Sequence, residues 1–105
     1  MKKKWGVLIS GNGSILQSVL DTPECERVVV VISSNKTAYG LLRARRAGIP
    51  VAVLPDELKP STHRREAEEW ILRQLEKYQV NQVFLAGFMR IVSPEFLKSC
   101  EIKFG

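Results

Sequence analysis

The chain has 105 residues, of which 45% are hydrophobic, and this length and composition fit one globular domain. Its apolar runs are far shorter than the about 20 residues needed to span a bilayer, and no signal peptide follows the basic start, so we expect a cytoplasmic protein without membrane contact. The net charge of +5 comes largely from Lys2-Lys3-Lys4 and Arg43-Ala44-Arg45-Arg46. Because no nucleic-acid-binding module accompanies this charge, we interpret it as a solvated basic surface and expect no nucleic-acid partner.

Residues that bind metals are scarce in this sequence. Cys25 and Cys100 lie far apart and form no C-x-x-C pair, which excludes a disulfide framework and a cysteine metal site. His63 is the only histidine, and it stands in a polar stretch that we expect to be the exposed start of a helix. We therefore expect no metal, and a Ser-His-Asp triad would have to use His63.

The strongest pattern is a strand, a glycine turn and a helix near the start of the chain. The apolar run of residues 5–9 leads into Ser10-Gly11-Asn12-Gly13-Ser14 and then into helical spacing. Gly11 and Gly13 can adopt positive φ, and N–H groups at a helix N-terminus favour an anion. We predict a phosphate or carboxylate site here. The third glycine of G-x-G-x-x-G is absent and no G-K-[ST] follows, so a tight turn capped by Ser14 without a ligand is the alternative.

Strand-like and helix-like segments alternate along the rest of the chain. The predicted strands are residues 28–33, 51–54 and 82–86. The predicted helices are one capped by Ser34-Asn35 and ended by Gly48, one over residues 61–78, and a short last one from Ser93-Pro94. Their expected apolar faces are Ala38, Leu41, Leu42 and Ala47 in the first, and Ala67, Ile71, Leu75 and Tyr78 in the second. This alternation predicts an α/β fold, a Rossmann-like doubly wound parallel sheet with helices on both faces.

A second, unusually apolar loop follows the fourth predicted strand, over residues 87–92. In a doubly wound sheet, ligands bind beyond the carboxyl ends of the strands, so we expect the loops after the first and fourth strands to be neighbours. Apolar side chains could line a slot for a flat heterocycle or fill the end of the sheet as core: Phe88, Met89, Ile91 and Val92.

Three segments carry a resemblance to a known family: Ile9-Ser10-Gly11-Asn12-Gly13-Ser14, Ser33-Ser34-Asn35-Lys36 and Ala86-Gly87-Phe88-Met89-Arg90-Ile91. Together they resemble the glycinamide ribonucleotide formyltransferases, which move a formyl group from 10-formyltetrahydrofolate to a ribonucleotide amine in purine biosynthesis. The resemblance covers essentially the whole chain and implies that fold and activity, with 10-formyltetrahydrofolate as co-substrate and no metal. The alternatives are a formyltetrahydrofolate hydrolase and a non-catalytic nucleotide- or folate-binding remnant.

The resemblance also implies two groups of binding residues. The ribonucleotide, with its phosphate on the backbone of the first loop, would contact Gly11, Asn12, Gly13, Ser14, Ile15, Gly87 and Met89. The folate would contact Arg65 (or its neighbour Arg64), Leu85, Phe88, Met89, Arg90, Ile91 and Val92. The family usually carries Asn or a similar residue at the position of Ile15, so only a backbone contact is expected there.

The family's catalytic residues have no counterpart in this sequence. Its catalytic Asn and His lie in an Asn-Ile-His-Pro segment shortly after a Lys-Phe-Gly-like stretch, and its catalytic Asp lies further on; this chain reaches Lys103-Phe104-Gly105 without them. We therefore expect residues 1–105 to be the amino-terminal part of a formyltransferase domain, with no catalytic residue and no activity alone. In the family a further strand pairs beside residues 82–86, so we expect these 105 residues by themselves to self-associate through that edge or to be much less stable than a whole enzyme.

Overall fold

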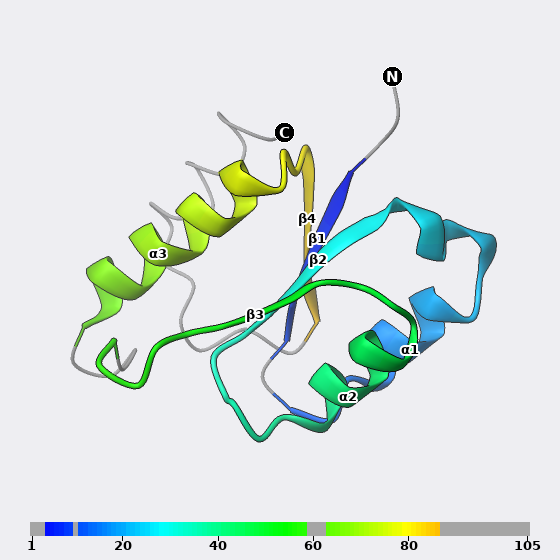
Figure 1. Ribbon diagram of the computed structural model, residues 1–105, viewed down its shortest axis with the longest axis horizontal. Helices are drawn as coiled ribbons and strands as arrows, with labels where there is room; N and C mark the ends of the chain where they lie inside the picture. Colours follow the sequence, from blue (N-terminus) through cyan, green and yellow to red (C-terminus); the bar gives the residue numbers. More distant parts are fainter. Residues whose placement is uncertain (1–3, 10, 59–62, 87–105) are drawn as a thin grey trace.

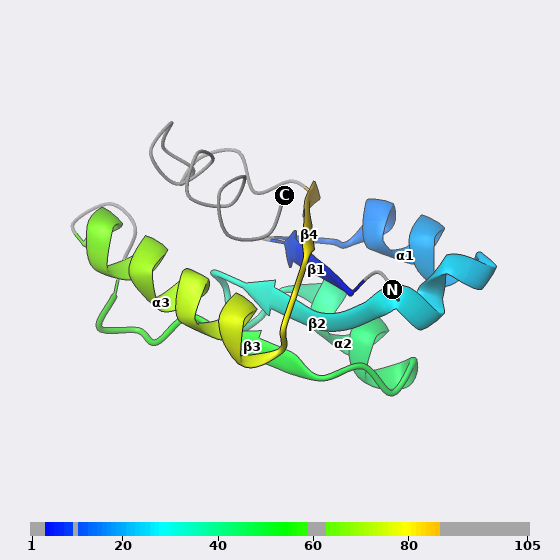
Figure 2. The same ribbon diagram turned by 90° about the horizontal axis from the view of Figure 1, so that it is seen from above.

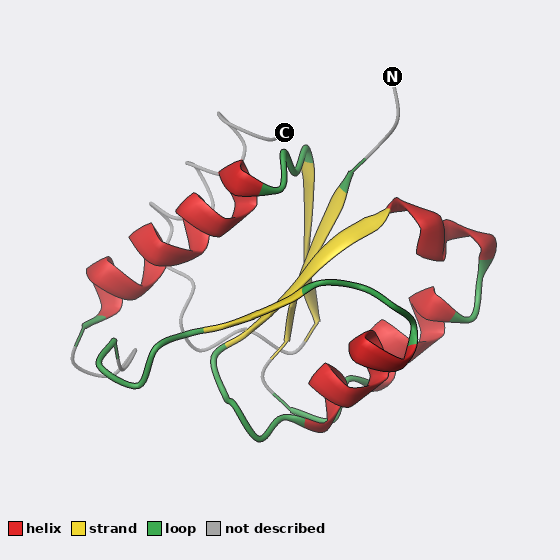
Figure 3. Cartoon of the chain, viewed as in Figure 1, coloured by secondary structure: helices red, strands yellow, loops and turns green. Residues whose placement is uncertain are grey.

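The computed structural model describes residues 4–9, 11–58 and 63–86, whose strands form one parallel sheet in the order β3-β2-β1-β4 (Figure 1). The strands are β1 (Trp5–Ile9), β2 (Val28–Ser33), β3 (Val51–Val53) and β4 (Gln82–Ala86). The helices are α1 (Ser14–Leu20), the short 3-10 helix η1 (Pro23–Arg27), α2 (Tyr39–Arg46) and α3 (Arg64–Lys77). Helices α1 and α2 cover one face and α3 covers the other (Figures 2 and 3), which confirms the predicted α/β architecture.

Strand β1 lies inside the sheet and contributes to a core on each face. Because successive side chains of a strand point to opposite faces, Leu8 enters the core beneath α3 while Val7 and Ile9 enter the core beneath α1 and α2. The buried members of the α3 core are Leu8, Val30, Ile32, Ile71, Leu75 and Val80. Those of the α1–α2 core are Val7, Ile9, Leu16, Val28, Val31, Ala38, Leu41 and Ala44. Burial on both faces explains the continuous apolar sequence of the inner strands.

The helices begin and end differently from the sequence predictions. Ser14 does not cap α1: it is the first helical residue, the N-cap is Gly13, and no side chain caps this end. Asn35 does not cap α2, because the helix starts at Tyr39; instead the Asn35 Oδ1 accepts hydrogen bonds from the Thr37 N–H at 3.0 Å and hydroxyl at 2.8 Å. A short polar side chain that closes a local turn in this way delays the helix.

The apolar face of α2 is also narrower than predicted. Leu41 is buried, but Leu42 is 38% exposed and Ala47 is exposed. Helix α3 runs over residues 64–77 with Ala67, Ile71 and Leu75 buried as predicted. No helix in the described residues has the length and apolar character needed to cross a membrane. The predicted helix from Ser93 lies outside the described residues.

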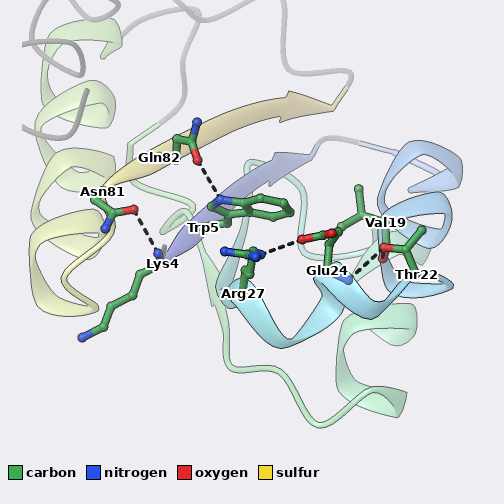
Figure 4. A network of polar contacts seen from close by, with 8 residues as sticks. All are labelled: Lys4, Trp5, Val19, Thr22, Glu24, Arg27, Asn81 and Gln82. Carbon is green, nitrogen blue, oxygen red and sulfur yellow. Dashed lines mark hydrogen bonds and ion pairs between the residues drawn. The ribbon is translucent and has the colours of Figure 1, made fainter. Parts of the chain in front are cut away.

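Polar contacts join the first residues of β1 and β4 at the amino edge of the sheet (Figure 4). The backbone N–H of Lys4 donates to Asn81 Oδ1 at 2.9 Å, and the Asn81 N–H donates back to the Lys4 carbonyl at 2.9 Å. The Trp5 Nε1–H donates to Gln82 Oε1 at 2.8 Å, and the Trp5 ring meets the Phe84 ring edge-on. These contacts favour the register in which Trp5 lies opposite Gln82, and hence the alignment of the far ends of both strands.

A core substitution tests the packing of α3 on the sheet. Leu75 is fully buried against Leu8, whereas Arg73 on the same helix is exposed. We expect Leu75→Ala to lower the free energy of unfolding by about 2–5 kcal/mol, because it leaves a cavity, and Arg73→Ala to change it by less than about 0.5 kcal/mol. Urea unfolding of the intact protein, followed by circular dichroism, measures both. Equal unfolding free energies for the two variants would contradict the packing.

Candidate functional site

The carboxyl ends of β1 and β4, from which the two predicted loops leave the sheet, lie side by side. Ile9, the last residue of β1, pairs with Ala86, the last residue of β4. The two strands therefore end next to each other at the same edge of the sheet. Residues 87–92 of the second loop, with the proposed contacts at Gly87, Phe88, Met89, Arg90, Ile91 and Val92, lie outside the described residues.

The first loop ends in a left-handed glycine that starts α1. Gly13 has φ +79°, and its carbonyl accepts the first helical hydrogen bond, from the Gln17 N–H at 2.8 Å. The N–H groups of the first helical turn, residues 14–16, have no acceptor inside the helix. Ser14 and Ile15 are exposed, Ile15 by 60%. The end of α1 thus presents backbone donors at an accessible surface, which is what an anion requires.

Helix α2 packs directly against this loop through a second glycine. A Cβ on Gly13 would lie 2.6 Å from the Gly40 Cα, and a Cβ on Gly40 would lie 2.5 Å from the Ile9 Cδ1. The Gly40 N–H also donates to the Gly11 carbonyl at 3.1 Å. The loop and the first turn of α2 therefore meet backbone to backbone. Gly40 was not among the predicted site residues; its signal in the sequence is a glycine at the second position of a helix, where helix propensity disfavours it.

Arg43 makes the side-chain hydrogen bonds between α2 and the loop. Its Nε donates to the Asn12 carbonyl at 3.0 Å, its Nη2 to Asn12 Oδ1 at 3.1 Å and its Nη1 to Gln17 Oε1 at 3.1 Å. Its guanidinium lies 4.8 Å from the centre of the Tyr39 ring. Arg45 and Arg46 are exposed, as a solvated basic surface requires, but that interpretation was wrong for Arg43.

The loop between β2 and α2 is organised by a buried serine. Ser33 is fully buried at the end of β2; its hydroxyl donates to the Asn35 carbonyl at 2.8 Å and accepts from the Asn35 N–H at 3.0 Å. The Ser33 carbonyl accepts from the Leu54 N–H at 2.8 Å. A buried hydroxyl with both a donor and an acceptor partner is stable in the core, and here it directs the chain from the sheet toward α2.

The described residues that were expected to contact folate lie on the other face of the sheet. Leu85 is half-buried against the core beneath α3, and Arg64 and Arg65 are exposed in the first turn of α3. Since α3 follows β3 and returns antiparallel to the strands, its first turn lies at the carboxyl edge, as the glycine loop does (Figure 1). His63 is the N-cap residue of α3 and is exposed, as predicted. The described residues contain no group of three or more His, Cys, Asp or Glu side chains placed to hold a metal ion.

Glycine substitutions test the contact between the loop and α2. Gly13→Ala is expected to lower the free energy of unfolding by about 1–3 kcal/mol, because alanine resists positive φ and its Cβ would meet Gly40. Gly11→Ala is the matched control, since a Cβ at Gly11 has no neighbour within 4 Å. Chemical unfolding monitored by fluorescence distinguishes them. If both variants unfolded at the same urea concentration, the close approach would be refuted.

Comparison with known proteins identifies a family of similar chains. Residues 3–104 match the family model described as formyl transferase. The chain is 42% identical over 96 residues to phosphoribosylglycinamide formyltransferase of Escherichia coli strain K12, covering 87% of this chain and 44% of that protein. It is 41% identical over 101 residues to the human trifunctional purine biosynthetic protein adenosine-3, covering 92% of this chain and 10% of that protein.

Solved structures show the same similarity in three dimensions. Glycinamide ribonucleotide transformylase 1 from Symbiobacterium toebii superimposes with a TM-score of 0.81 at 38% identity, over 96% of this chain and 49% of that one. Phosphoribosylglycinamide formyltransferase from Brucella melitensis gives 0.83 at 27% identity, over 98% and 55%. The chain thus spans about half the length of these single-function relatives, and far less of the trifunctional protein.

Proposed function

Because the chain belongs to the formyl transferase family, we propose that the protein transfers a formyl group from 10-formyltetrahydrofolate to the amine of glycinamide ribonucleotide. One observation carries this proposal beyond the family: a glycine loop that leads into a helix start without a side-chain cap stands at the carboxyl edge of the sheet, next to the end of β4. An anion held there would fix one end of a ribonucleotide while its other end extends along that edge. Relatives with 38–42% identity carry names for this activity.

In the proposed complex, the ribonucleotide phosphate binds the loop of residues 11–15. The N–H groups of Gly13, Ser14 and Ile15 donate to the phosphate, and the dipole of the first helical turn adds to the attraction. The side chain of Ile15 contributes no hydrogen bond, so binding there depends on the backbone alone. Gly87 and Met89 would contact the glycinamide part of the substrate.

The folate would bind across β4 from the other face of the sheet. Arg65 would contribute a cation at the mouth of the site and Leu85 an apolar contact, and Phe88, Met89, Arg90, Ile91 and Val92 would complete the slot. The two substrates would then meet at the adjoining ends of β1 and β4. Placing two reactants in this way replaces a bimolecular encounter by a step within one complex.

The proposed reaction is direct acyl transfer. The amine nitrogen forms a bond to the formyl carbon, the bond from that carbon to N10 of the folate breaks, and one proton passes from the amine to N10. The step needs a proton acceptor and a group that stabilises the tetrahedral oxyanion. We assign neither the proton acceptor nor the oxyanion-stabilising group to a described residue. The role proposed for the described residues is to bind and orient the substrates.

The activity is tested with the intact protein and both substrates. We expect formylated glycinamide ribonucleotide and tetrahydrofolate to appear in equal amounts, and no product when either substrate is left out. Chromatography of the nucleotides, with the absorbance of the released folate, measures the reaction. Release of formate without the ribonucleotide would instead indicate a formyltetrahydrofolate hydrolase. Binding of either substrate without turnover would indicate a non-catalytic binding protein.

A charge substitution tests the phosphate site without disturbing the core. Ile15 is 60% exposed in the first turn of α1, so Ile15→Asp places a carboxylate beside the proposed phosphate. Repulsion between this carboxylate and the phosphate is expected to weaken binding of glycinamide ribonucleotide by about tenfold. Ile15→Asn is the neutral control of the same shape and should bind within about twofold of the unmodified protein. Isothermal titration calorimetry measures the affinities; equal affinities of both variants would place the phosphate elsewhere.

A further inference from the structure

The glycine loop turns its backbone carbonyls toward α2. The Gly11 carbonyl accepts from the Gly40 N–H at 3.1 Å, and the Asn12 carbonyl accepts from Arg43 Nε at 3.0 Å. In a trans peptide the C=O and the following N–H point in opposite directions. The N–H groups of Asn12 and Gly13 therefore point away from α2. This orientation matters for an anion, which is repelled by carbonyl oxygens and attracted by N–H groups.

Arg43 is the side chain that holds this orientation. Two of its donors go to Asn12, one to the backbone oxygen and one to the side-chain oxygen, in the forked geometry of a guanidinium. The Arg43 side chain is half-buried, and the Tyr39 ring lies against its guanidinium at 4.8 Å. A side chain that is held in place before the ligand arrives lowers the entropy cost of ordering the loop on binding.

The same arginine also bonds to Gln17 on α1, at 3.1 Å from Nη1 to Oε1. Arg43 therefore has two separable connections, one to the loop through Asn12 and one to the α1 helix through Gln17. Only the first fixes the peptide between Asn12 and Gly13. Exposed Arg46, one turn further along α2, carries the same charge without this contact to Asn12.

We propose that Arg43 is a positioning residue for the ribonucleotide: by holding the Asn12 carbonyl against α2, it turns the backbone donors of the loop toward the phosphate without itself being a phosphate ligand. The inference rests on the proposed function, because it assumes that the ribonucleotide phosphate occupies this loop. Phosphate binding would then depend on a residue outside the loop as well as on the loop sequence. The loop must accept two hydrogen bonds from a guanidinium group on another helix, and a positive charge nearby does not suffice to orient its N–H groups.

The test compares Arg43→Met and Arg43→Lys in the intact protein, by calorimetric titration with glycinamide ribonucleotide and with inorganic phosphate. We expect Arg43→Met to weaken both affinities by about tenfold or more, as for loss of a charge-assisted hydrogen bond, while folate affinity and kcat at saturating ribonucleotide stay within about twofold. Arg43→Lys keeps the charge but not the fork, and is expected to recover less than half of the lost binding free energy. Full recovery with lysine would overturn the proposal, since charge alone would then account for the effect.

Two further variants separate positioning from general effects. Gln17→Ala removes the link from Arg43 to α1, together with the exposed Gln17–Asp21 hydrogen bond within α1, and leaves both Arg43 contacts to Asn12 in place. Arg46→Met removes one charge from α2. Both variants should bind phosphate within about twofold of the unmodified protein. If Gln17→Ala weakened binding as much as Arg43→Met, Arg43 would act through helix packing and the proposal would fail. An equal loss in Arg46→Met would assign the effect to net charge and would also overturn it.

Amide resonances provide a readout that reports the loop itself, even if a variant is less stable. In the unmodified protein, phosphate should shift the Gly13 amide resonance; in folded Arg43→Met that shift should shrink at equal saturation. An unchanged Gly13 shift in Arg43→Met would contradict the proposed orientation. If the unmodified protein transfers formyl groups and all variants bind alike, only this inference fails. If the unmodified protein does not bind the ribonucleotide, the proposed function fails, and the inference fails with it.

Discussion

The burial of β1 on both faces is the constraint from which the other elements take their positions. β1 pairs with β2 on one side and β4 on the other, and its alternate side chains enter the two cores. A shift of one residue in its pairing would exchange the two sets of side chains between faces, so the register is strongly fixed. Once it is fixed, the chain must leave β1 at the carboxyl edge, beside the end of β4, and that is where the candidate site lies.

Helix α2 shows how one element can serve both the core and the site. Leu41 and Ala44, three residues apart, share a stripe that packs on the sheet. Gly40 and Arg43, offset by one residue and also three apart, share the neighbouring stripe, which contacts the glycine loop. The packing of Leu41 and Ala44 on the sheet therefore sets the distance between the loop and the stripe of Gly40 and Arg43.

Under the proposed function, the two substrates approach the same edge from opposite faces of the sheet. The ribonucleotide loop lies on the side of α1 and α2, whereas Arg65 and Leu85 lie on the side of α3. The reacting groups can meet only where the faces join, at the ends of the two adjacent strands Trp5–Ile9 and Gln82–Ala86. The polar contacts at the opposite edge, from Lys4 and Trp5 to β4, are then relevant to function because they support the alignment of those ends.

The local sequence determined the strands, the class of fold and the place of the glycine loop. The runs at residues 5–9, 28–33 and 82–86 became strands with the predicted bounds. The runs at 5–9 and 28–33 fit inner strands that are buried on both faces, whereas β4 begins with exposed Gln82 and has Phe84 39% exposed. The glycine turn and the helix after it also followed from local preferences. Helix starts were predicted less well: Ser14 is the first residue of α1 and not its cap, and Asn35 closes a local turn with Thr37 before α2 begins.

What only the tertiary structure decided is which residues hold the loop. Arg43 belongs to a run of basic residues, and its neighbours Arg45 and Arg46 are exposed. Nothing in the local pattern distinguishes the arginine that bonds to Asn12, because its partner lies 31 residues away and is brought near by the packing of α2 on the sheet. Gly40 is similar: its lack of a side chain matters because Gly13 and Ile9 approach it from elsewhere in the chain. Local preferences depend on near neighbours along the chain, whereas these contacts depend on distances set by the whole packed sheet.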